Sequence, residues 1–74
     1  MYIRKVSIGP DYKSGAMHYV QGNYISKNST DIIDTIQVLD DGSVKIWIKT
    51  RDGIVLWKEF NKHMPYSVEY NINL

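Results

Sequence analysis

The residues of this chain that are best suited to binding chemistry begin at position 57, in the stretch WKEFNKHMPYSVEYN. Trp57 and Tyr66 carry aromatic rings that can stack on a nucleobase, an interaction worth about 1–3 kcal/mol per base. Lys58 follows Trp57 directly, and its positive charge can neutralise a phosphate. We therefore expect this stretch to contribute to the binding of an aromatic, anionic ligand such as a nucleotide.

Four further residues could complete such a site. Arg51 and Lys13 are cations that suit phosphate, and His18 and Asn71 can form hydrogen bonds with a base or a ribose. The predicted ligand-binding residues are Trp57, Tyr66, Arg51, Lys58, Lys13, His18 and Asn71.

The two tryptophans lie on neighbouring predicted strands. Trp47 stands between two lysines on the polar face of residues 43–50, and Trp57 lies on the returning strand, residues 54–60. We expect the two indoles and the nearby cations to share one surface. The alternative is that the indoles cover a second small core or a subunit contact, with lysine side chains extending past them to water. A ligand pocket at such a contact is compatible with both interpretations.

Catalysis and metal binding are not expected. The chain has no cysteine, which excludes disulfides, thiolate metal sites and cysteine nucleophiles. His18 and His63 are the only histidines, and neither belongs to a metal-binding motif. No serine or aspartate has an informative spacing from either histidine, and no glycine-rich phosphate loop is present. We predict a protein that is not an enzyme and that needs no metal or cofactor.

The elements that must position these residues are strands, because apolar and polar residues alternate along most of the chain. Strands are predicted at 2–8, 17–21, 43–50, 54–60 and 67–74. Val68 and Tyr70 are placed on the core face of the last strand. The expected fold is a single all-β domain over residues 1–74: an antiparallel meander of five or six strands, strongly twisted or curled into a partly closed barrel.

Residues 31–39 are ambiguous. Ile32, Ile33 and Ile36 have the spacing of a short helix, but β-branched residues dominate the segment and favour a strand. Glycine turns are predicted at Asp40-Asp41-Gly42 and Arg51-Asp52-Gly53.

Size and charge narrow the function classes. A 74-residue chain has a small core, and without disulfides the support that remains is self-association, so a homo-oligomer is predicted. The formal net charge of +1 argues against a duplex-DNA binder. No apolar run is long enough for a membrane helix, and no signal peptide follows Met1, so a cytoplasmic location is expected.

Three segments, SGAMHYVQG (14–22), LWKEF (56–60) and MPYSVEYNINL (64–74), together resemble small phage proteins of the Thoeris anti-defence sponge family. The resemblance implies a non-catalytic oligomer in the cytoplasm of an infected bacterium. Such a protein would sequester cyclic nucleotide immune signals, either cyclic ADP-ribose isomers or cyclic oligonucleotides, in pockets between protomers. Some family members carry additional helical sequence that this chain lacks.

Two other functions fit the same residues. The first is a small inhibitor that blocks a host enzyme or defence protein through an edge strand or a Tyr/Trp surface. The second is a small barrel that binds single-stranded nucleic acid through the face of Lys45, Trp47 and Lys49, with an affinity that falls steeply with salt.

Overall fold

The computed structural model describes residues 2–9 and 15–71. The predicted all-β fold is confirmed, because the described residues form six strands and no helix. No described segment is therefore a helix that could span a membrane. The strands are β1 (Tyr2–Ile8), β2 (Met17–Val20), β3 (Ile32–Val38), β4 (Val44–Thr50), β5 (Gly53–Phe60) and β6 (Tyr66–Asn71).

The ambiguous segment is a strand, β3, so the helical alternative for residues 31–39 is wrong. A bulge between Ile33 and Thr35 shifts the register with β4 by one residue. As a result Ile33 and Ile36, three positions apart, both face the core opposite buried isoleucines of β4. The bulge explains why the apolar spacing resembled that of a helix.

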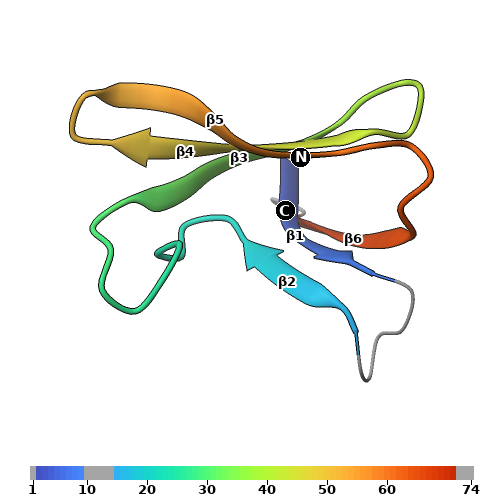
Figure 1. Ribbon diagram of the computed structural model, residues 1–74, viewed down its shortest axis with the longest axis horizontal. Coiled ribbons are helices and arrows are strands. Elements are labelled where there is room, and N and C mark those ends of the chain that lie inside the picture. The colour runs from blue at the N-terminus through green and yellow to red at the C-terminus, as the bar shows by residue number, and fades with distance from the viewer. Residues whose placement is uncertain (1, 10–14, 72–74) are drawn as a thin grey trace.

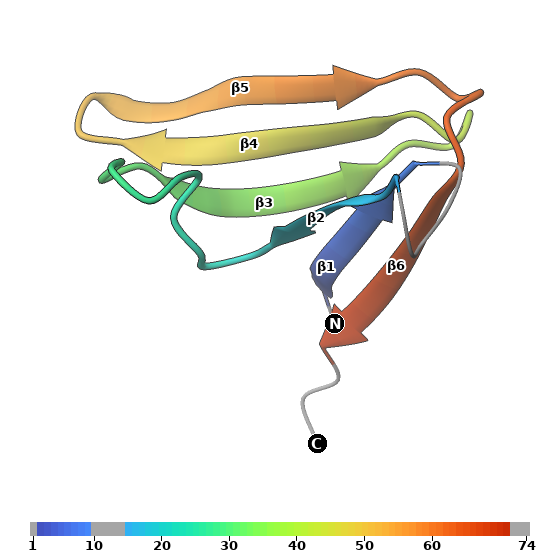
Figure 2. The ribbon, with the colours of Figure 1, turned by 60° about the horizontal axis from the view of Figure 1, so that its bottom comes forward.

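The six strands form two antiparallel sheets with the orders β2-β1-β6 and β3-β4-β5 (Figure 1). They do not follow one another in a single meander, because β1 pairs with β6 from the other end of the chain. The sheets are not closed into a barrel. Figure 2 shows β1 and β6 crossing the direction of β3, β4 and β5 at a steep angle.

The core lies between the two sheets. Val6, Val44 and Ile46 are its most deeply buried side chains. A core residue that was predicted but not found is Tyr70, whose side chain is 49% exposed. A bulge in the pairing of β1 with β6, between Ile3 and Lys5, changes the register near Tyr70. The buried apolar residues of the described chain are Val6, Ile8, Tyr19, Ile33, Ile36, Val44, Ile46 and Ile48.

The turn between β3 and β4 forms where it was predicted. Gly42 has a φ of +91°, a conformation that suits glycine and is rare for other residues. The backbone N–H and the hydroxyl of Ser43 both donate hydrogen bonds to Oδ1 of Asp41, at 2.9 and 2.7 Å. These bonds lower the pKa of Asp41, because they stabilise its charged form.

Candidate functional site

A bulge in β5 decides where Trp57 points. Trp47 pairs with Leu56 and Ile46 pairs with Lys58, so Trp57 is an extra residue without a counterpart on β4. A bulge of this kind bends the strand and redirects its side chains. The residues of β5 on either side of Trp57 therefore do not continue one alternating pattern.

The two tryptophans consequently face opposite sides of their sheet. Trp57 packs edge-on against the buried Tyr19 of β2, with ring centroids 5.8 Å apart and planes at 82°. Trp47 lies on the outer side, where its Nε1–H donates a hydrogen bond of 3.2 Å to Oε1 of Gln37. The predicted surface shared by both indoles is therefore wrong, and only Trp57 reaches the space between the sheets.

A hollow of about 280 Å³ lies between β2 of one sheet and β5 of the other. We call it the aromatic cleft, because Tyr19 and Trp57 line it from opposite sheets and the exposed Tyr24 lines it from the loop after β2. Its lining residues are Met17, His18, Tyr19, Val20, Asn23, Tyr24, Ile25, Ile33, Trp57 and Lys58. The cleft offers two features that a nucleotide needs, aromatic rings and polar groups beside them.

Lys58 supplies the positive charge of the aromatic cleft. Its Nζ lies 4.9 Å from the ring centroid of Trp57 and 5.9 Å from that of Tyr19. Both distances fall within the range of a cation–π interaction, about 6 Å. The ion pairs between the described side chains are Arg4–Glu69 and Lys45–Glu59, and Lys58 belongs to neither. The ammonium group is thus held beside the rings by the rings themselves.

His18 lies on β2 beside the aromatic cleft, and its side chain is bonded to Ser7 on the neighbouring strand. The Ser7 hydroxyl and Nδ1 of His18 are 2.7 Å apart, in a strand register that places the two residues opposite each other. Sequence spacing gave no sign of this pair, because the register of β1 with β2 brings together residues that are 11 positions apart. The bond holds the imidazole on the outer face of the β2-β1-β6 sheet, the face opposite to the one from which the adjacent Tyr19 reaches the cleft.

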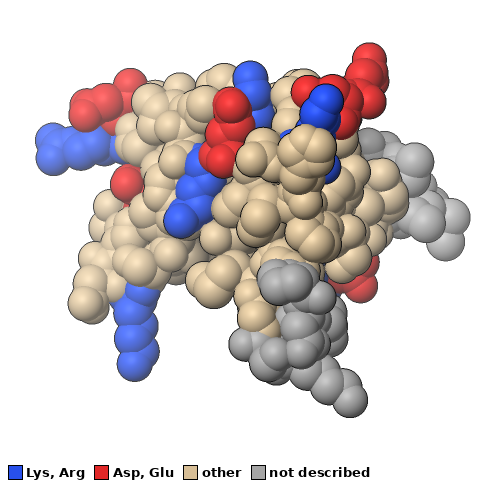
Figure 3. All heavy atoms as spheres, turned by 45° about the vertical axis from the view of Figure 1, so that its right-hand side comes forward, with Lys and Arg blue, Asp and Glu red and all other residues tan. Residues whose placement is uncertain are grey.

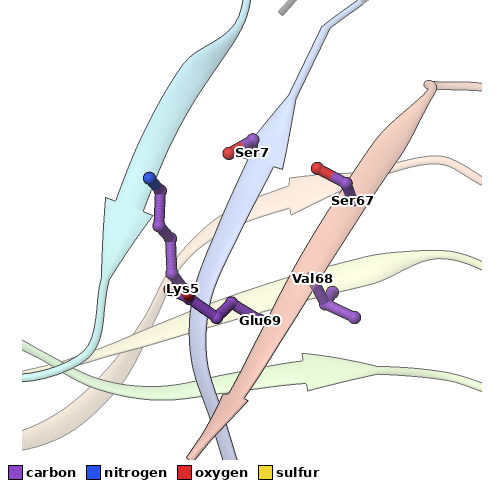
Figure 4. Close-up of a pocket in the computed structure, with 5 residues that line it drawn as sticks. All are labelled: Lys5, Ser7, Ser67, Val68 and Glu69. Atoms are coloured by element: carbon purple, nitrogen blue, oxygen red, sulfur yellow. The ribbon is translucent and has the colours of Figure 1, made fainter.

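Ser7 also belongs to a second, smaller hollow on the outer face of the β2-β1-β6 sheet. Figure 4 shows Ser7 and Ser67 on neighbouring strands, with Lys5 extending towards β2. The volume of this hollow is about 140 Å³, below the roughly 300–1,000 Å³ of typical ligand pockets. A serine bonded to a histidine can belong to a nucleophilic site, but such a site also needs a place for the reacting group and donors for an oxyanion. The aromatic cleft is therefore the stronger candidate for ligand binding.

The structure brings the side chains of two of the seven predicted ligand-binding residues, Trp57 and Lys58, together in the cleft. His18 borders the cleft along β2, but its imidazole is bonded to Ser7 on the outer face of the sheet. Tyr66 lines a different hollow next to Gly9 and Pro65. Arg51 lies in the exposed turn between β4 and β5.

The last two predicted residues lie elsewhere. Asn71 ends β6, where its side-chain amide donates a hydrogen bond to the Tyr2 hydroxyl. Lys13 is outside the described residues. Tyr19 and Tyr24 are cleft residues that were not predicted, because alternation does not reveal which residues of β2 face β5.

Charge and metal ligands do not add another site. Within residues 2–9 and 15–71, no three histidine, aspartate or glutamate side chains gather closely enough to hold a metal ion. Lysine and arginine lie interspersed with aspartate and glutamate on the face shown in Figure 3. This face therefore lacks the continuous positively charged patch that is typical of a protein that binds a nucleic-acid duplex.

Comparisons of the chain with protein-family models, curated proteins and solved structures found no match.

Proposed function

We propose that this protein binds a nucleotide-like ligand in the aromatic cleft and sequesters it without chemical change. The proposal depends on side chains from two sheets that converge on one hollow: Tyr19 from β2, and Trp57 with Lys58 from β5. Rings and a cation at one place suit a ligand with a flat aromatic part and an anionic part.

The observation that carries this proposal is the position of the Lys58 ammonium group over the Trp57 ring, at 4.9 Å. The interaction places the charge next to an aromatic face before any ligand arrives, which reduces the entropy that binding would cost. A base that stacks at Trp57 would thus bring its phosphate within reach of Lys58.

The size of the cleft bears on the ligand. Its volume of about 280 Å³ lies near the lower limit of the roughly 300–1,000 Å³ that small-molecule sites occupy. This volume suits one base with its ribose, and a cyclic nucleotide would need further walls from a second protomer. The resemblance to anti-defence sponges supports the same ligand class. The corresponding role is the capture of cyclic nucleotide immune signals on behalf of a phage.

The proposal is tested by isothermal titration calorimetry with a panel of cyclic nucleotides. Lys58→Gln removes the charge of the cleft and should weaken binding about tenfold, because a charge-assisted hydrogen bond at a half-buried position contributes about 1.5 kcal/mol. The matched control is Lys49→Gln, which makes the same change at an exposed position of the neighbouring strand β4, opposite Ile54. The control should bind within about twofold of the original protein.

Equal effects of the two substitutions would contradict the cleft as the site. The same holds if no cyclic nucleotide in the panel binds to the unmodified protein. Hydrolysis of the bound nucleotide would contradict sequestration while leaving the site in place.

A further inference from the structure

Lys58 lies on the face of its sheet that packs against the core. The strand pairing sets it opposite Ile46, whose side chain is 0% exposed. The inward positions of β5 on either side of it are Val55 and Phe60, which pair with buried residues of β4. A half-buried lysine thus interrupts a row that is otherwise apolar. A charge in such surroundings costs free energy unless a specific interaction stabilises it.

The rings of Trp57 and Tyr19 supply that interaction. Their centroids are 5.8 Å apart, and Nζ of Lys58 lies 4.9 Å from the first and 5.9 Å from the second. Because the ammonium group lies over both rings, whose planes meet at 82°, it occupies the angle between them. Neither ion pair between described side chains includes Lys58, so the rings are its stabilising partners in the described part of the chain.

The ammonium group lies where a stacked base would lie. The centroids of stacked aromatic rings are about 4.5–7 Å apart, and Nζ lies within that range of the Trp57 centroid. The Trp57 ring packs against the core and meets Tyr19 edge-on, so a ligand reaches it from the aromatic cleft, which Lys58 also lines. A base can therefore stack on Trp57 from the cleft only if the ammonium group moves aside.

The lysine side chain is able to move in this way. Its ammonium group is carried by a flexible four-carbon stem, while the backbone of Lys58 is held in β5 by its pairing with β4. Displacement of the ammonium group breaks no ion pair between described side chains and requires no change in the sheet.

We infer that Lys58 makes the aromatic cleft selective for phosphorylated ligands by competing with the base for the Trp57 ring; this inference rests on the proposed function. An uncharged nucleoside displaces the ammonium group and offers it no new partner, so the cation–π interaction is lost. A nucleotide displaces the same group but brings a phosphate, with which the ammonium group forms a charge-assisted hydrogen bond. Lys58 therefore opposes the first ligand and favours the second.

A charge at this position could have a different role. An inward-pointing charge on an edge strand discourages pairing with other sheets, and β5 is the edge of the order β3-β4-β5. That role needs the charge alone and predicts no effect on the choice of ligand. The two roles therefore differ in what a neutral substitution changes, which is ligand preference in one case and self-association in the other.

Isothermal titration calorimetry with matched ligands tests the inference. Adenosine and guanosine are compared with their 5′-monophosphates and 3′,5′-cyclic monophosphates, which differ from them only in the phosphate. Lys58→Gln should strengthen the binding of the nucleoside about two- to fivefold, because the competing cation–π interaction is gone. The same substitution should weaken binding of the phosphorylated ligands about tenfold.

Two further variants complete the comparison. Lys58→Arg keeps a cation that stacks on aromatic rings and should retain the preference for phosphorylated ligands. The matched control Lys49→Gln removes a charge from an exposed position of β4 and should leave every affinity within about twofold of the original.

NMR spectroscopy of the original protein tests the same competition without a substitution. The ε-methylene protons of Lys58, held over two rings, should resonate upfield of those of the other lysines. Saturation with a 5′-monophosphate that binds should move them towards the exposed lysines, and an unchanged shift would overturn the inference.

The outcomes separate this inference from the proposed function. If nucleotides bind but Lys58→Gln does not strengthen nucleoside binding, the inference is overturned and the proposed function stands. A Lys58→Gln variant that self-associates in sedimentation velocity and keeps its ligand preference would also overturn the inference, and would assign Lys58 to protection of the β5 edge. If no ligand of either set binds to the original protein at millimolar concentration, both the inference and nucleotide binding in the cleft are contradicted.

Discussion

Replacement of Trp57 separates its contribution to the fold from its contribution to binding. The side chain is partly buried, packs on the core and meets Tyr19 edge-on at 5.8 Å. Replacing a fully buried tryptophan by alanine lowers the free energy of unfolding by about 3–5 kcal/mol. Because Trp57 is only partly buried, we expect roughly half of that loss, about 2 kcal/mol. The edge-to-face contact adds about 0.5–1.5 kcal/mol. Trp57→Ala should therefore lower the free energy of unfolding by about 3 kcal/mol.

Trp47 provides the matched control, because it is partly buried too but lies on the outer face of the sheet. Substitutions at such strand positions span about 1 kcal/mol, so Trp47→Ala should lower the free energy of unfolding by about that amount. The difference of about 2 kcal/mol corresponds to a difference in Tm of about 8–16 °C for a domain of this size. Urea titrations of both variants, at one protein concentration because association affects stability, measure the difference.

Trp57→Leu keeps apolar volume at the same position and removes the aromatic ring. This variant should remain folded and lose the base-stacking contribution of about 1–3 kcal/mol, which weakens nucleotide binding about 5- to 150-fold. Equal destabilisation by Trp57→Ala and Trp47→Ala would refute the assignment of Trp57 to the space between the sheets. Unchanged nucleotide affinity of Trp57→Leu would refute its role in stacking.

Three further predictions concern the fold. Ile46→Ala, at a side chain with 0% exposure, should cost about 2–5 kcal/mol and leave the domain largely unfolded, as a loss of cooperative urea unfolding would show. Gly9→Ala should destabilise the protein by more than Gly22→Ala in thermal unfolding. Both glycines have positive φ values, but a Cβ at position 9 would lie 2.6 Å from a backbone oxygen, whereas one at position 22 would meet open space. The hydrogen bonds from Ser43 lower the pKa of Asp41 below its ordinary value of 3.8. Their contribution to the free energy of unfolding is therefore complete above pH 3.8 and disappears as the pH falls through the lowered pKa. The stability difference between the original protein and Asp41→Ala should accordingly shrink below pH 3.8 in urea titrations at stepped pH; a difference that grows there would contradict this assignment.

The local fold was largely predictable because alternation reports directly on a half-buried strand. Residues 2–8 were predicted as a strand and form β1 with the same bounds. The turn at Gly42 was predictable because its conformation depends on the residue itself. The pairing of β1 with β6 was not predictable, because alternation indicates which residues face the core and does not identify the partner strand.

The bulges account for most of what the sequence did not reveal. In β5 the extra residue Trp57 turns away from Trp47, so a surface predicted to carry both indoles carries one. In β3 the bulge after Ile33 gives strand residues the spacing of a helix. A bulge is fixed by contacts across the sheet and between sheets, such as that of Trp57 with Tyr19, and these contacts have no counterpart in local sequence.

The candidate site was predictable by residue type and only partly by position. Trp57 and Lys58 have the chemistry of nucleotide binding and do meet in one cleft. His18 lies beside the cleft, but its side chain bonds to Ser7 on the other face of the sheet. Asn71 has equally suitable chemistry but bonds to Tyr2 at the far end of β6. The difference arises from the sheet arrangement, which sets β2 against β5.

Native mass spectrometry with a panel of cyclic nucleotides tests the central claim most directly, that the aromatic cleft captures a nucleotide without altering it. The account predicts a complex of protein and ligand that releases the intact nucleotide on heat denaturation and is lost in Trp57→Leu. Absence of any complex, or release of a cleaved nucleotide, would contradict it.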